Sequence, residues 1–170
     1  MLQEAFEQLR EGQFESALEA FNACLALSPV EPEAYRGRGL AHFQLKQWSP
    51  AAMDFRKAGE LNPDEPGNAI GLGMSLAMQS EVYPALDVLE DLVARRPDYV
   101  PGLIQLGLLY FKLCLIAKGR EHLEKALASR PGLAERRLIE ETLKDEKKLD
   151  QKRYYRPDFE ALRKVRRAAS

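Results

Sequence analysis

A proline recurs at one fixed spacing along this chain of 170 residues, with 34 residues between each occurrence and the next: Pro29, Pro63, Pro97 and Pro131. Proline cannot continue a helix, and it biases the residue before it away from the helical conformation. A fixed period of this length indicates an array of repeated units. We therefore predict units that each close with a helix end immediately before the proline, at Ser28, Asn62, Arg96 and Arg130.

Other residue types recur in the same register. Small residues stand twenty-four and twelve positions before the prolines: Ala5, Gly39, Gly73 and Gly107, and then Ala17, Ala51, Ala85 and Gly119. Eight positions before the prolines the residue is large and apolar: Phe21, Phe55, Leu89 and Leu123. Small residues let two helix backbones approach closely, whereas bulk would push them apart. Small residues at these two positions would therefore allow close packing within each unit.

This register resembles the tetratricopeptide repeat, a helix-turn-helix unit with small residues where its helices touch and a proline at its end. The resemblance covers residues 1 to about 133 and implies an all-α fold, a right-handed superhelix of four helix pairs at 1–31, 32–65, 66–99 and 100–133. The first helices are expected at 2–11, 33–45, 67–79 and 101–113, and the second at 14–27, 48–61, 82–95 and 116–129. Leu92 and Gly119 replace alanines usual in the family, which is expected to alter helix spacing locally.

Two further segments follow the fourth proline. Residues 134–151 read as a charged capping helix, which repeat arrays need to cover their last apolar face. Residues 152–170 read as a basic hinge and a short amphipathic helix, with Phe159, Leu162 and Val165 on one stripe. This tail carries seven basic and two acidic residues, a net charge of +5, which leaves −6 on residues 1–151.

The resemblance also implies where a partner would bind. The first helices of such repeats line a concave wall that holds other polypeptides. The wall residues expected here are Phe6, Arg10, Arg36, Leu40, Phe43, Ile70, Met74, Met78, Ile104, Leu108, Phe111 and Lys112. Most are apolar, which suits the apolar face of a helix or an extended apolar peptide. The family's carboxylate clamp for acidic chaperone C-termini is not expected, because its positions hold Leu2, Phe6, Gly37, Gly67 and Gly71.

Three functions remain open on the sequence. The first is a protein-binding scaffold or adaptor. The second is a chaperone-like holder of secreted or membrane-complex subunits. The third, from another class, is contact with an anionic surface or nucleic acid through the basic tail, which the acidic remainder of the chain disfavours. The tail stripe could also dock into the groove of its own chain or of a neighbour, which would give autoinhibition or self-association.

No catalytic or metal-binding pattern emerges. His42 and His122 are isolated from each other, Cys24 and Cys114 lack zinc-site spacing, and no nucleophile-base set is recognisable. The segments Gly37-Arg38-Gly39 and Gly71-Leu72-Gly73 fall within predicted helices, so we interpret them as packing sites and not phosphate loops. We expect no enzyme activity, no cofactor and no metal. The cysteine content and the acidic N-terminal segment favour a cytoplasmic protein.

Overall fold

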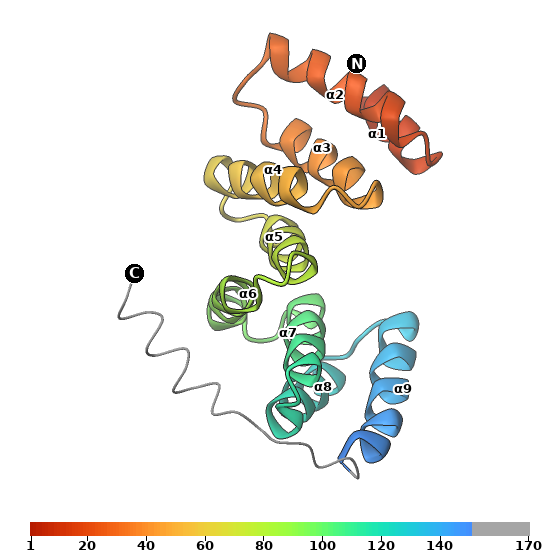
Figure 1. Cartoon of the computed structure of the whole chain (residues 1–170), viewed down its shortest axis with the longest axis vertical. Helices are drawn as coiled ribbons and strands as arrows, with labels where there is room; N and C mark the ends of the chain where they lie inside the picture. The colour runs from red at the N-terminus through yellow and green to blue at the C-terminus, as the bar shows by residue number, and fades with distance from the viewer. Residues whose placement is uncertain (151–170) are drawn as a thin grey trace. The chain divides into compact units, whose positions relative to one another are not determined.

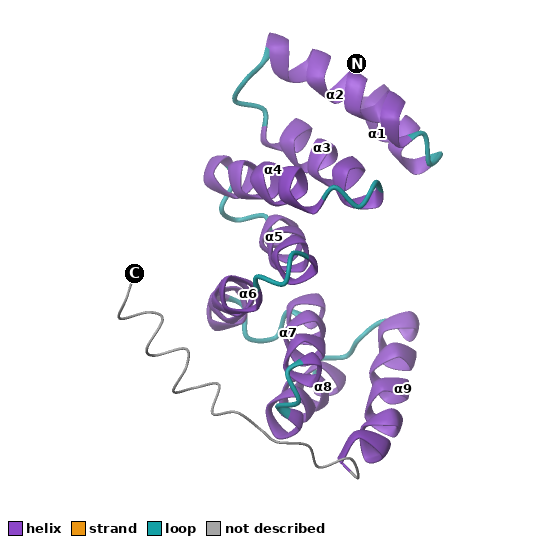
Figure 2. Ribbon diagram, viewed as in Figure 1, coloured by secondary structure: helices purple, strands orange, loops and turns teal. Residues whose placement is uncertain are grey.

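The computed structural model describes the backbone of residues 1–150 and the side chains of residues 1–145. In this part of the chain every regular element is a helix (Figures 1 and 2). The chain forms two compact units, one spanning Met1–Pro97 and the other beginning at Asp98. The predicted tail stripe of Phe159, Leu162 and Val165 lies outside the described residues.

The first unit contains three helix pairs: α1 (Leu2–Arg10), α2 (Phe14–Leu27), α3 (Pro32–Gln44), α4 (Trp48–Leu61), α5 (Pro66–Met78) and α6 (Val82–Arg95). The second unit contains α7 (Val100–Lys112), α8 (Ile116–Ala128) and α9 (Leu133–Asp150). Each helix begins and ends within one residue of its predicted bounds. The all-α repeat fold is therefore confirmed, whereas a superhelix running through all four pairs stays a prediction.

The turn inside each pair has the same backbone geometry four times. One residue takes a positive φ: Gly12 (79°), Lys46 (59°), Ser80 (64°) and Cys114 (58°). At the second turn the amide of Lys46 donates to the carbonyl of Phe43 at 3.0 Å, and the amide of Gln47 donates to that of His42 at 2.9 Å. These two bonds are the Schellman arrangement, which pairs carbonyls left open at a helix end. Each first helix therefore ends at a defined residue.

The connections between pairs follow the prolines. Ser28, Asn62 and Arg96 end α2, α4 and α6 with φ between −132° and −138° and ψ between 77° and 87°, which is non-helical as expected before proline. At the fourth proline the prediction is off by one residue. There Ser129 is the C-cap and Arg130 takes a φ of 57°, because the left-handed region is another way out of the helix before Pro131.

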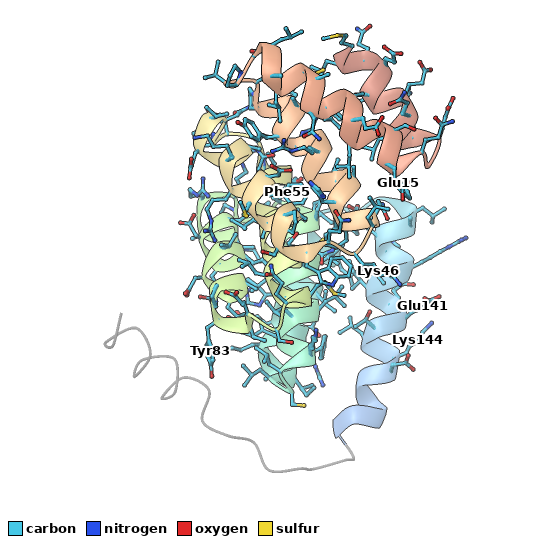
Figure 3. All side chains as sticks on the ribbon, turned by 45° about the horizontal axis from the view of Figure 1, so that its top comes forward. Glu15, Lys46, Phe55, Tyr83, Glu141 and Lys144 are labelled. Atoms are coloured by element: carbon cyan, nitrogen blue, oxygen red, sulfur yellow. The ribbon has the colours of Figure 1, made fainter. Side chains whose placement is uncertain are left out.

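The core of the first unit is built from the register positions. Ala5, Ala17, Ala51 and Ala85 are fully buried. The large residues of the register, Phe21, Phe55 and Leu89, have exposed fractions of 2% or less. Burying such a side chain stabilises the fold by roughly 1.5–3 kcal/mol. Figure 3 labels Phe55 on α4, among the helices of this unit.

The second unit is packed by the same rule with glycine on both helices. A Cβ on Gly119 of α8 would lie 2.9 Å from the carbonyl oxygen of Gly107 on α7 and 3.1 Å from the Phe111 ring. The two backbones therefore touch, which accounts for glycine at this position. The helix α9 packs on α8 and buries Ile139 completely, whereas Leu133 and Leu138 stay exposed. Glu141 and Lys144 project outward from α9 (Figure 3).

Candidate protein-binding surface

The first helices of the first unit are neighbours, since α1 contacts α3 and α3 contacts α5. We call the surface formed by their predicted wall residues the A face: Phe6, Arg10, Arg36, Leu40, Phe43, Ile70, Met74 and Met78. On α3 and α5 these residues recur every three or four positions, so each set lies along one side of its helix. Arg36 joins two of the helices, because its guanidinium lies 5.9 Å from the centre of the Phe6 ring on α1.

The A face is apolar and partly open to solvent. Met78 has an exposed fraction of 49%, and Phe6, Leu40, Ile70 and Met74 are half-buried. Phe43 is also half-buried, and the Trp48 ring packs edge-on against it at 5.0 Å. At the edge of the face, Arg10 is exposed and lies 3.7 Å from Glu7. The outer parts of these side chains are therefore available to a partner.

Two glycines hold these helices in position. A Cβ on Gly37 of α3 would overlap the Phe21 ring of α2, and a Cβ on Gly71 of α5 would lie 2.5 Å from the Phe55 ring of α4. Each phenylalanine thus extends from the second helix of one pair toward the first helix of the following pair. The space that its ring occupies is open only because the facing residue there is glycine. The glycine-containing segments are packing sites within α3 and α5, as predicted.

The wall residues predicted in the second unit differ from those of the A face. Ile104 and Phe111 have exposed fractions of 3% and 8%, so they belong to the core of that unit. Leu108 is half-buried and Lys112 is exposed. Phe111 is covered because its ring packs over Gly119. The prediction from the register therefore counted two core residues of this unit, Ile104 and Phe111, among the wall residues.

A polar cluster links α2, α3 and α4, and the sequence analysis missed it. The Arg38 guanidinium donates to both carboxylate oxygens of Asp54, at 2.9 and 2.7 Å, and to Oδ1 of Asn22 at 2.7 Å. His42 lies 3.8 Å from the same carboxylate and 2.6 Å from the Gln47 side-chain oxygen. The register offered one signal, because the counterparts of Arg38 and Asp54 in the next repeat are Leu72 and Val88.

The cluster is structural in character. Asp54 has an exposed fraction of only 5%, and its hydrogen bonds raise the pKa of Arg38 above the ordinary value despite the opposing effect of burial. Folding therefore favours the charged form of Arg38, and the contribution of Arg38 to stability would be lost only as the pH rose through that raised pKa. His42 is also a member of this network.

The remaining candidate chemical groups are dispersed. Cys24 is buried and Cys114 is exposed at a left-handed turn position. His122 packs against the Tyr110 ring at 5.4 Å and lies within hydrogen-bond distance of the Lys118 carbonyl. Among the described residues no group of three or more histidine, cysteine or acidic side chains could hold a metal ion. No described helix has both the length and the hydropathy that a membrane crossing requires.

Comparison with known proteins agrees with this geometry. Residues 6–68 match the family model of the tetratricopeptide repeat. The BBSome complex member BBS4 of Bos taurus is 28% identical over 120 residues, which are 71% of this chain and 23% of the relative. The chain thus spans less than a quarter of the length of that relative.

Two solved structures share the fold. The thermophilic TPR protein TTC0263 of Thermus thermophilus has a TM-score of 0.67 at 24% identity, covering 99% of this chain and 95% of that one. The first TPR of Spaghetti (RPAP3), solved bound to the HSP90 peptide SRMEEVD, has a TM-score of 0.62 at 18% identity, covering 66% of this chain and 89% of that one.

The repeated helix-turn-helix pairs, packed through small residues at a constant register, define a helical-repeat protein. The match of residues 6–68 to the family model and the shared fold show that the chain contains repeats of the tetratricopeptide type. This fold supports a role as a scaffold for protein–protein interaction.

Proposed function

We propose that the chain is a protein–protein interaction scaffold that binds the apolar side of a helix, or an extended apolar peptide, on its A face. The observation that carries the proposal is a row of half-buried apolar side chains on α3 and α5 that ends at the exposed Met78. An apolar surface shared by adjacent helices is the kind of groove into which amphipathic helices dock.

The side chains of the A face suit this role. Met74 and Met78 are flexible and polarisable, so they adapt to apolar partners of different shape. The face differs from a site for acidic peptides, because the clamp positions hold Leu2, Phe6, Gly37, Gly67 and Gly71. The first TPR of Spaghetti (RPAP3), which shares the fold, was solved with a bound HSP90 peptide. This likeness supports the binding of a peptide by the present chain, but it does not support HSP90 as the ligand.

Titration with a designed peptide tests the proposal. The probe is a fluorescent amphipathic helix with leucines at positions i, i+3, i+4 and i+7, and its control is a peptide of the same composition in scrambled order. We expect fluorescence anisotropy to show saturable binding of the patterned peptide only. In the double variant Met74→Glu and Met78→Glu, a charge would face the apolar peptide, so its affinity should fall at least about tenfold.

The matched control is Met53→Glu. Met53 is an exposed methionine on α4, with an exposed fraction of 67%, and it lies outside the A face. The Met53→Glu variant should bind the peptide as tightly as the unaltered chain does. Its helical circular dichroism should also be unchanged. Equal binding of patterned and scrambled peptides, or undiminished binding by the double variant, would contradict the proposal. The chaperone-like alternative would instead show as suppressed aggregation of an unfolded client.

A further inference from the structure

A cavity is present on the first unit, and none of its lining residues belongs to the A face. It has a volume of about 230 Å³ and is lined by α4, α5, α6 and the connection from α4 to α5: Phe55, Arg56, Gly59, Pro63, Glu65, Asn68, Ala69, Leu72, Val88, Asp91 and Arg95. Successive residues of a helix are turned by roughly 100° about its axis, so Leu72 lies about 160° from both Ile70 and Met74 on α5. The cavity and the A face therefore use different sides of α5.

The repeat register explains why this cavity exists. Every lining residue has a counterpart 34 positions earlier, at the junction of α2, α3 and α4. At that junction the counterparts of Gly59 and Ala69 are Leu25, which belongs to the buried core cluster with Phe21, and Tyr35, which packs against that cluster. At the cavity an isobutyl group and a phenol ring are therefore replaced by a hydrogen atom and a methyl group.

The earlier junction also shows what fills such a space. There the Tyr35 hydroxyl donates to the carbonyl of Pro29 at 3.1 Å, and the Arg38 guanidinium lies 5.5 Å from the centre of the ring. The counterpart of Pro29 at the cavity is Pro63, which is a lining residue. A tyrosine ring bound in the cavity would thus have the Pro63 carbonyl as a hydrogen-bond acceptor, as Tyr35 has the Pro29 carbonyl at the earlier junction.

Two polar side chains of the cavity point to a ligand. Asn68 has an exposed fraction of 3%, and its Nδ2 donates to the Asn62 carbonyl at 3.3 Å, yet its Oδ1 is buried without a hydrogen-bond partner among the described residues. A buried acceptor left unpaired is costly, so a donor arriving with a ligand is favoured. Arg56 is exposed at the same cavity, and a cation there is complementary to an aromatic ring or to a carboxylate.

We propose that this cavity binds a tyrosine side chain of a partner polypeptide, with an acidic residue next to that tyrosine. The ring takes the place that Tyr35 occupies at the earlier junction. The hydroxyl donates to the Pro63 carbonyl or to Asn68 Oδ1, and the neighbouring carboxylate pairs with Arg56. The site is independent of the A face, so the chain would hold a partner at two separate surfaces.

The probe is the capped peptide Ser-Tyr-Glu-Ser, titrated into the full chain while the amide resonances of Gly59 and Asn68 are followed by nuclear magnetic resonance. We expect saturable shifts at both residues. Replacing tyrosine by phenylalanine in the peptide should weaken binding about fivefold to tenfold, because the hydroxyl is lost. Replacing glutamate by glutamine should weaken it by less than about fivefold, as for an exposed ion pair.

A filled variant gives the sharpest test. Gly59→Leu with Ala69→Tyr restores the residues of the earlier junction, and a Cβ on Gly59 meets no atom closer than Asn68 Cβ at 3.8 Å. This variant should unfold at a higher temperature than the unaltered chain and yet lose the peptide. If the double variant does not fold, Gly59→Leu alone decides the question. The control Met53→Ala changes an exposed residue of α4 that does not line the cavity, so it should leave the peptide affinity unchanged.

Three outcomes would overturn the proposal. The first is the absence of saturable shifts at Gly59 and Asn68. The second is unchanged binding by the filled variant. The third concerns the chain's own tail, which contains Tyr154 and Tyr155. If deleting residues 151–170 shifts the resonances of Gly59 and Asn68 without any peptide present, the cavity belongs to the tail and not to a partner.

Discussion

At the turn inside each helix pair, one residue has a left-handed backbone conformation. Residues other than glycine adopt this conformation at a cost in free energy. Lys46, Ser80 and Cys114 occupy the left-handed region that Gly12 occupies in the first repeat. The cost is about 1–2 kcal/mol for an ordinary residue and is absent for glycine. The Schellman hydrogen bonds at each turn keep the conformation in place.

We therefore expect Ser80→Gly to stabilise the protein by about 0.5–1 kcal/mol, since relief of the left-handed strain outweighs the added freedom of the unfolded chain. Urea denaturation followed by circular dichroism measures the change. The same substitution at Ser16, inside α2, should destabilise by a few tenths of a kcal/mol, because serine is the better helix former. A loss of stability in Ser80→Gly would show that the turn is not strained.

The cluster around Arg38 and Asp54 leads to a second prediction. Asp54→Val leaves a partly buried guanidinium without its carboxylate and should cost about 3 kcal/mol of unfolding free energy. Adding Arg38→Leu reproduces the residues of the next repeat, Leu72 and Val88, and should recover most of that loss. A double-mutant cycle in urea measures the coupling. Simple additivity of the two losses would contradict the assigned pairing.

Some residue roles followed from the sequence and others did not. The register identified Phe21, Phe55 and the small residues at the helix contacts, because each position is tested four times by one spacing rule. It did not reveal the Arg38–Asp54 pair, because the pair occurs in one repeat and depends on how two helices face each other. For the same reason the buried state of Ile104 and Phe111 was missed.

At the level of helices, the spacing between first and second helices depends on what each glycine faces. Gly71 of α5 faces the Phe55 ring closely, whereas a Cβ on Gly59 of α4 would meet only Asn68 Cβ, at an ordinary contact distance of 3.8 Å. Helix bounds were predictable to one residue because the prolines and the 34-residue register limit each helix. The cavity beside Gly59 was not predictable, because a missing side chain leaves no pattern of its own.

The two glycines predict opposite effects for one substitution. Gly71→Ala should destabilise the protein by about 1–3 kcal/mol, because the added methyl group lies 2.5 Å from the Phe55 ring. Gly59→Ala should stabilise it by up to about 1 kcal/mol, because alanine is the better helix former and its nearest neighbour is 3.8 Å away. Thermal and urea unfolding of the two variants give the comparison. Effects of equal sign would mean that the packing of α4 on α5 differs from that described.

At the scale of the whole molecule, the first unit has a core of its own. Its six helices carry the buried side chains of Phe21, Phe55, Leu86, Leu89 and Leu92. We expect a fragment of residues 1–97 to keep its helical circular dichroism and to unfold in one cooperative step in urea. Exposure of the end of a repeat array reduces solubility, so dilute solutions are required. A non-cooperative or absent transition would show that the unit depends on the remainder of the chain.

The fit of a phenylalanine ring against a glycine in the next helix pair also limits how such a chain can change its length. A unit that carries Phe21 or Phe55 can be followed only by a unit with glycine at the facing position, as Gly37 and Gly71 are here. Duplicating, deleting or reordering whole repeats therefore has to preserve this pairing at every new boundary. The repeats have the same length and the same helices, but they are not interchangeable parts.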